Sequence, residues 1–255
     1  MGLFSLPKKP KSRSDNEAIK ALLKIACSST GDEKEHEKPY MDKALAAVED
    51  YIGGGIKNAK LAYWLGVAWR NYTAWHIRGD ERKPFLEKST EYFRQALKLA
   101  KNQLPIRLPL EKRHQVESLD QITIAGDSGF MLVENALMRN LNEAERILKF
   151  VAENTQEYEP CLCPYAELYY KRGNYKKAAE IALNAYERAK KSPEWKTTIP
   201  PAPLGIAGKA YRALGKKAKK QRRIKEAAKW YQKIVELGVA TENDKKTLKK
   251  LRQTK

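Results

Sequence analysis

Cysteine is scarce in this sequence, and its few residues are poorly placed for a disulfide framework or a metal site. The chain has 255 residues and three cysteines, Cys27, Cys161 and Cys163. An odd number of cysteines argues against a set of disulfides and agrees with a reducing compartment. Cys161 and Cys163 are spaced C-x-C with no second cysteine or histidine pair nearby, whereas zinc takes about four ligands. The sequence therefore predicts no metal site, and we expect this pair to pack as small residues at a helix start.

Long apolar runs are also missing. No hydrophobic stretch approaches the roughly 18 residues that a membrane-spanning helix needs. The apolar stretch in residues 1–6 is too short for a signal peptide, and basic residues follow it instead of preceding it. Leu6 stands where an N-myristoylation motif requires serine or threonine. We therefore expect a cytoplasmic protein without a transmembrane segment.

Signatures of catalysis are incomplete. The string Ala125-Gly-Asp-Ser-Gly129 is similar to the nucleophile loop of trypsin-like serine proteases, but no base or orienting acid accompanies it. We expect Asp127 and Ser128 to cap a helix that begins near Gly129 instead. The glycines at 53–55 are not followed by the Lys-Ser/Thr of a phosphate-binding loop. The sequence therefore predicts no enzymatic activity and no cofactor.

The sequence does contain the apolar spacing of helices. Hydrophobic residues make up 42% of the chain, as in folded proteins. In stretches such as residues 92–99 and 181–186, apolar residues stand three and four apart, which is the period of one helical face. Few runs alternate as strands do, and prolines and glycines fall between the helical stretches. These patterns favour an all-α fold.

One segment has the composition of a helical hairpin repeat. Residues 165–185 read Tyr-Ala-Glu-Leu-Tyr-Tyr-Lys-Arg-Gly-Asn-Tyr-Lys-Lys-Ala-Ala-Glu-Ile-Ala-Leu-Asn-Ala. Ala166 and Tyr169 would lie in a first helix, and Gly173 and Asn174 would form the turn. The segment resembles a tetratricopeptide repeat, a pair of antiparallel helices that recurs about every 34 residues.

The spacing of small residues along the chain supports this resemblance. Ala144 precedes Ala178 by 34 residues. The step from Ala144 to Ala166 is 22 residues, as is the step from Ala44 to Gly66. The inner positions of four second helices are predicted with a common spacing of four and then three residues: Ser89, Phe93 and Ala96; Ala144, Leu148 and Val151; Ala178, Ala182 and Ala185; Ala227, Tyr231 and Ile234.

The resemblance implies an all-α, right-handed α-solenoid of about five antiparallel helix hairpins with a C-terminal capping helix. One hairpin cannot bury both apolar faces, so neighbouring hairpins must stack, and we expect the tryptophans to pack between them. The expected parts are a basic flexible tail (1–14), N-terminal hairpins with one long hairpin that turns near Gly79 (15–104), an irregular insertion (105–127), C-terminal hairpins (128–238) and a basic capping helix (239–255).

The resemblance also implies a concave groove lined by the first helix of each hairpin. The family's offsets around the small residue select nine positions: Lys60, Tyr63, Arg70, Asn71, Glu167, Tyr170, Lys171, Lys209 and Arg212. Most are cationic, amide-bearing or aromatic, which favours an acidic peptide or a C-terminal carboxylate of a partner protein. The first functional hypothesis is therefore a scaffold or adaptor that holds a partner in this groove. The alternative is that these residues form an ordinary polar surface.

Charge is concentrated at the two ends of the chain. The formal net charge is +19, of which residues 1–14 contribute +4 and residues 205–255 contribute +13. The remaining 190 residues carry only +2. Charge in this arrangement indicates contact surface added to a scaffold, or else ends that only aid solubility.

The densest cationic run supplies the second functional hypothesis. Residues 216–223 contain six cations: Lys216, Lys217, Lys219, Lys220, Arg222 and Arg223. Gly215 stands where the repeat expects its turn glycine, so seven surplus residues either form the turn or lengthen the helices by about two turns. With the lysines near the C-terminus, the run would bind RNA, DNA, a ribosome or an anionic membrane through phosphate contacts. The sequence leaves open whether the chain forms a homo-oligomer.

Overall fold

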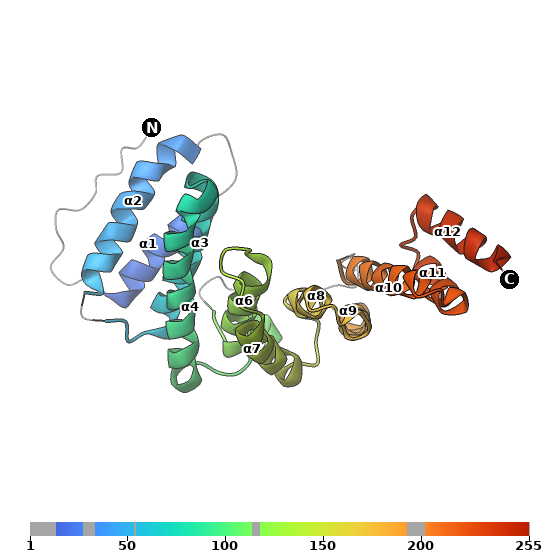
Figure 1. Ribbon diagram of the computed structural model, residues 1–255. Coiled ribbons are helices and arrows are strands. Elements are labelled where there is room, and N and C mark those ends of the chain that lie inside the picture. The colour runs from blue at the N-terminus through green and yellow to red at the C-terminus, as the bar shows by residue number, and fades with distance from the viewer. Residues whose placement is uncertain (1–13, 28–33, 54, 114–117, 193–201, 255) are drawn as a thin grey trace. The chain divides into compact units, whose positions relative to one another are not determined.

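The computed structural model describes residues 14–27, 34–53, 55–113, 118–192 and 202–254. Within these ranges the chain contains helices and no β-strand, and the helices pack against their neighbours (Figure 1). The chain divides into two compact units, residues 1–124 and 125–255. The all-α class is thus confirmed, whereas the right-handed solenoid of hairpins stays a prediction. The predicted basic tail, apart from Ser14, lies outside the described residues.

Unit 1 is built around helix α3. Its elements are α1 (Asp15–Cys27), α2 (Lys34–Tyr51), α3 (Ala59–His76), the short 3-10 helix η1 (Gly79–Arg82), α4 (Lys83–Gln103), α5 (Leu110–Arg113) and the first residues of α6 (Gln121–Glu134). Helix α3 contacts α1, α2 and α4. The side chain of Asn58 caps α3 by accepting hydrogen bonds from the backbone amides of Lys60 and Leu61. Because α3 is covered on several sides, almost all of it from residue 59 to residue 69 is buried.

The pair α3 and α4 shows why a small residue stands at position 66. A Cβ atom on Gly66 would lie 3.2 Å from the ring of Phe93, and the Ser89 hydroxyl donates a hydrogen bond to the Gly66 carbonyl at 2.7 Å. The helices approach closely at this point because Gly66 has no side chain. The chain turns at Gly79, whose φ of 62° lies in the left-handed region. The predicted long hairpin with its turn near Gly79 is therefore present.

Helix α6 begins earlier than predicted. It starts at Gln121, and the Asp120 carboxylate accepts hydrogen bonds from the backbone amide and the hydroxyl of Thr123, each at 2.8 Å. Asp127 and Ser128 lie inside this helix, so the expected cap near Gly129 is wrong. The apolar residues that precede Gly129 continue the helical pattern, and Asp120 supplies the start signal.

Unit 2 continues α6 and adds six helices in chain order. They are α7 (Leu141–Asn154), α8 (Leu162–Lys171), α9 (Tyr175–Lys191), α10 (Ala202–Lys220), α11 (Ile224–Glu236) and α12 (Glu242–Gln253). Each helix from α7 to α12 contacts the next one, and α8 also contacts α10. The turn between α8 and α9 uses Gly173 at a φ of 76°, and the Asn174 side chain caps α9. The predicted Gly-Asn turn and the predicted C-terminal helix are both confirmed.

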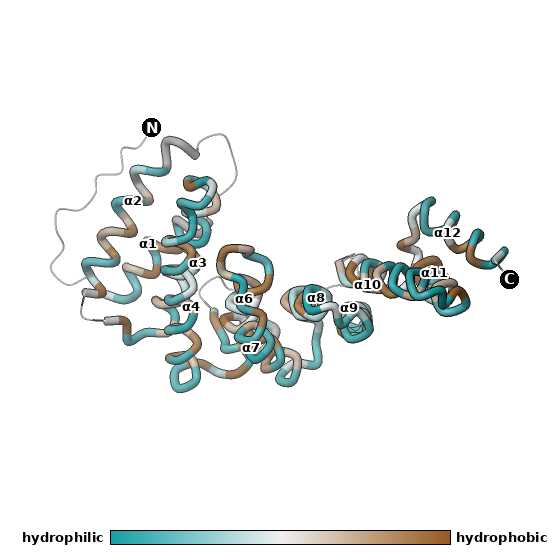
Figure 2. Tube along the Cα trace, in the orientation of Figure 1, coloured by the Kyte–Doolittle hydropathy of each residue, from teal (hydrophilic) through white to brown (hydrophobic). Residues whose placement is uncertain are grey.

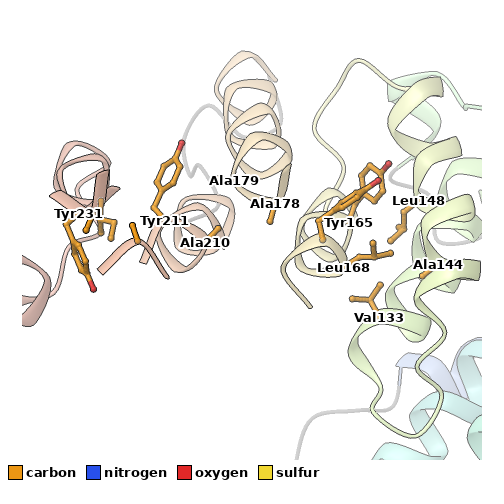
Figure 3. Close-up of a cluster of buried hydrophobic side chains, with 14 of the residues drawn as sticks. Val133, Ala144, Leu148, Tyr165, Leu168, Ala178, Ala179, Ala210, Tyr211 and Tyr231 are labelled. Atoms are coloured by element: carbon orange, nitrogen blue, oxygen red, sulfur yellow. The ribbon is translucent and has the colours of Figure 1, made fainter. Parts of the chain in front are cut away.

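The core of unit 2 follows the predicted repeat positions (Figure 3). The sequence predicts three inner positions on each of α4, α7, α9 and α11. All twelve of these residues are buried. Helix α2 departs from this pattern, because Ala44 is only half-buried and the buried residues there are Met41, Leu45 and Val48. The alanines are the small side chains of this core, and Tyr165, Tyr211 and Tyr231 are its large aromatic ones (Figure 3).

Candidate polyanion-binding surface

Helix α10 is longer than its predicted repeat counterpart, and its extension carries the cationic run. Gly215 lies inside α10, where a Cβ atom would come within 2.7 Å of the Tyr231 ring. It is therefore a packing glycine and not a turn glycine. The chain turns after Lys220, at Arg222, which has a positive φ of 56°. Of the two arrangements that the sequence allows, the structure has the lengthened helix.

We call Lys216, Lys217, Lys219, Lys220, Arg222 and Arg223 the basic turn. All six side chains are exposed, on the last turns of α10 and the residues before α11. Arg223 forms an ion pair with Glu226. Among the described residues, no acidic partner is found for the other five cations. The basic turn thus presents a positive charge that the neighbouring side chains leave largely uncompensated.

Two local effects bear on this concentration of charge. The C-terminus of α10 carries a partial negative charge, which stabilises nearby cations. Lys216 and Lys220 are four residues apart on the same helix, and Lys217 and Lys220 are three apart, so like charges lie beside one another and repel. The helix end therefore stabilises only some of the six cations, and the others have no compensating charge within the helix.

The aromatic side chains beside the basic turn are occupied within the fold. The rings of Tyr211 and Trp230 stack with centroids 5.5 Å apart, and the Lys233 ammonium lies 5.1 Å from the Tyr211 ring centroid. Tyr211 is buried and Trp230 is half-buried. Trp230 also donates a hydrogen bond to Glu226. Because these rings pack on each other, the aromatic residues form part of the core rather than an open stacking platform.

Helix α12 is attached through a buried carboxylate. Asp244 accepts two hydrogen bonds from the Arg212 guanidinium, at 2.9 and 2.6 Å, and its side chain is only 3% exposed. Asp244 also accepts from the backbone amide and hydroxyl of Thr241, which completes a capping box. The hydrogen bonds from Arg212, together with those from Thr241, lower the pKa of Asp244 to about 2. Asp244 is not among the predicted site residues, although the Thr-x-x-Asp spacing in the sequence signals such a cap.

Three of the predicted groove residues in unit 2 meet between α8 and α10. The Lys209 ammonium contacts both Glu167 oxygens, at 3.0 and 3.1 Å, and lies 4.3 Å from the Tyr170 ring centroid. Lys171 lies 3.9 Å from Glu134, and Arg212 is engaged by Asp244. The cationic groove residues of this unit are therefore paired with carboxylates of the protein itself.

The predicted groove residues of unit 1 lie on α3. Tyr63 is buried, and its ring packs against Trp64 and Phe93 with centroids 5.0 and 5.8 Å away. Lys60, Arg70 and Asn71 are half-buried. The Arg70 guanidinium lies 5.9 Å from the Phe93 ring centroid. Little of Tyr63 is accessible to a partner, since the long hairpin of α3 and α4 covers it.

The serine and the cysteine considered above for catalysis or metal binding lie within the packed helices. Ser128 is buried within α6. The Cys163 thiol lies 3.7 Å from the Tyr158 hydroxyl, and burial raises the pKa of this thiol. In the part of the chain that the structure describes, no group of three or more histidine, cysteine or acidic residues is arranged to hold a metal ion. None of the described helices combines the length and hydrophobicity required to span a bilayer.

No protein-family model matches the chain, and no curated protein matches its sequence. Its likeness to tetratricopeptide repeats therefore rests on the residues and spacings described above.

Proposed function

We propose that the protein is a non-catalytic helical scaffold of the tetratricopeptide kind, whose C-terminal helices bind the phosphate backbone of a nucleic acid. The single observation that carries the proposal is the basic turn, where five of six exposed cations have no acidic partner among the described residues. Cations of this kind bind phosphates by releasing the counterions that surround a polyanion. The binding requires no particular base sequence.

Two features of the same helices favour nucleic acid over a bilayer. Tyr51, Ile106, Phe130 and Leu137 are the large hydrophobic residues that the structure shows exposed, and none of them belongs to α10, α11 or α12. A surface that inserts into lipid normally presents such residues beside its lysines. Much of α12 is hydrophilic (Figure 2), and the leucines it carries at positions 248 and 251 are buried. The described surface is therefore suited to contacts with charged phosphates.

The same structure favours contact with the backbone over contact with bases. Proteins that hold single strands usually stack bases on exposed aromatic rings. Tyr211 and Trp230 are stacked on one another instead. We therefore expect a duplex to bind at least as tightly as a single strand of the same length, with little preference for sequence.

The experiment compares two charge reversals in the full chain. Lys216→Glu with Lys220→Glu alters the basic turn, whereas the control, Lys176→Glu with Lys191→Glu, alters exposed lysines of α9 by the same net charge. Binding to a fluorescent duplex of arbitrary sequence is measured by anisotropy at about 0.1 M salt. We expect the basic-turn variant to lose at least about tenfold in affinity and the control to lose less than about threefold. Equal losses would refute the assignment, as would capture of the protein by anionic vesicles but not by the duplex.

A second candidate function is binding of an acidic peptide along the first helices of the hairpins. It is favoured by Lys209, which is 46% exposed and pairs with Glu167, so that it joins α8 and α10, the helices on which the sequence predicts the groove. An incoming carboxylate would have to displace Glu167 from this lysine. Lys209→Ala should then weaken capture of an acidic peptide while duplex binding stays unchanged.

A further inference from the structure

A second basic surface lies between α11 and α12. A shallow depression of about 470 Å³ opens there, and seven residues line it: Gln232, Val235, Lys245, Leu248, Lys249, Arg252 and Gln253. We call it the basic depression. Three of the lining side chains are cations, two are amides and none is a carboxylate. This composition is that of a site for an anion with several oxygen acceptors.

The cations of the basic depression have different local partners. Arg252 donates a hydrogen bond from Nη2 to the Oε1 atom of Gln232 at 2.7 Å, which links α12 to α11. Lys245 pairs with Glu242 at 2.7 Å, and both of these side chains are mostly exposed. The structure shows no acidic partner for Lys249 among the described residues. One guanidinium is thus held in place, and one ammonium is available to an anion.

Helical geometry places like charges beside one another in the basic depression. Lys245 and Lys249 are four residues apart on α12, and Lys249 and Arg252 are three apart, so these like charges are neighbours that repel. The partial negative charge at the helix end compensates cations in the last turn of α12. Lys245 lies near the first turn, and its charge is compensated instead by the ion pair with Glu242. A bound anion would reduce the repulsion among all three.

We propose that the basic depression binds a phosphate group through Lys245, Lys249 and Arg252. This inference rests on the proposed function, because we take the phosphate group to be part of a nucleic-acid backbone. Helices α11 and α12 are joined by a loop of five residues and contact each other, and Arg252 of α12 reaches Gln232 of α11. Gln232 lies eight residues from the start of α11, which is about 12 Å along the helix. This separation is short compared with the length of a duplex, and we expect one duplex to contact both the basic turn and the basic depression.

The test uses pyrophosphate as the probe and two single substitutions in the full chain. Lys249→Gln removes a cation from the depression, whereas the control, Lys246→Gln, removes an exposed cation from α12 that does not line it. Both variants also relieve repulsion on the helix. At constant ionic strength and about tenfold excess over its Kd, pyrophosphate should raise the wild-type melting temperature by about 3 °C. We expect Lys246→Gln to keep this rise and Lys249→Gln to lose at least half of it.

A duplex titration identifies the source of the phosphate. Lys249→Gln should make the slope of log K against log salt shallower by about 0.9, the value for one phosphate contact. Absence of protection by pyrophosphate, or equal protection of the wild type and Lys249→Gln, overturns the phosphate site, even if the basic-turn variant still loses duplex binding. Protection by pyrophosphate without any duplex binding supports the phosphate site and refutes the proposed function.

Discussion

Replacing Asp244 with asparagine removes the negative charge from the ion pair that joins α12 to Arg212 of α10, while keeping the size of the side chain. The carboxylate is 3% exposed and accepts two hydrogen bonds from Arg212, whose own side chain is 28% exposed. Asparagine still offers an oxygen to Thr241, so the cap of α12 is largely kept. The substitution therefore isolates the charged part of the interaction.

The pKa of Asp244 gives the size of the effect. The hydrogen bonds from Arg212, followed in importance by those from Thr241, lower the pKa from its ordinary 3.8 to about 2. A group with a lower pKa in the folded state stabilises the fold above the unfolded pKa, and this stability is lost as the pH falls through the folded pKa. At 1.36 kcal/mol per pKa unit, and allowing for partial exposure of Arg212, the contribution at pH 7 is about 2 kcal/mol. At pH 2.5 less than half of it remains.

Urea unfolding of the full chain, followed by circular dichroism, measures this contribution. Glu242→Gln is the matched control, because it removes the same charge from the first turn of α12 at a side chain that is 77% exposed. We expect Asp244→Asn to lower the free energy of unfolding by about 2 kcal/mol at pH 7 and by less than about 1 kcal/mol at pH 2.5. The control should change it by less than about 0.5 kcal/mol at both values. A loss for Asp244→Asn that is the same at both pH values would refute the reasoning.

Three further outcomes test the packing. Gly215→Ala places a methyl group 2.7 Å from the Tyr231 ring and should lower the free energy of unfolding by about 1 kcal/mol. Gly205→Ala, on the same helix but with open space around it, should raise it by about 0.5 kcal/mol, and urea unfolding distinguishes the two variants. Alkylation of Cys163, followed by mass spectrometry at pH 8, should be slower in the folded protein than in urea, because burial raises the pKa of the thiol; equal rates would contradict this. Arg172→Ala should cost about 1–2 kcal/mol in thermal unfolding, since its guanidinium joins α8 to the first residues of α7, and an unchanged melting temperature would contradict that role.

The helices and their buried faces were predictable because they depend on local spacing. The sequence spacing predicts that Ala144, Ala178 and Ala227 are buried, and all three are fully buried. The early start of α6 was missed because an internal Asp-Ser pair was interpreted as a cap, although Asp120 supplies one. A polar residue favours a helix start, but only the neighbouring residues determine whether the helix has already begun.

The candidate sites were less predictable because they depend on pairing across helices. The sequence identifies the basic turn as a charged run. Whether its cations can reach a partner depends on their exposure, which the structure shows. It does not reveal that Arg212 is engaged by Asp244, 32 residues later. Nor does it reveal that Lys249 and Arg252 border a depression with Gln232, since this requires the packing of α12 on α11.

The salt dependence of duplex binding tests the proposed function most directly. Association constants for the wild-type chain are measured by anisotropy from about 50 to 200 mM salt, with the same duplex throughout. Five cations of the basic turn without an acidic partner, together with one phosphate contact in the basic depression, predict a slope of log K against log salt of about −5. A slope shallower than about −1, or a duplex that does not bind even at the lowest salt, would contradict a phosphate-binding role for this surface.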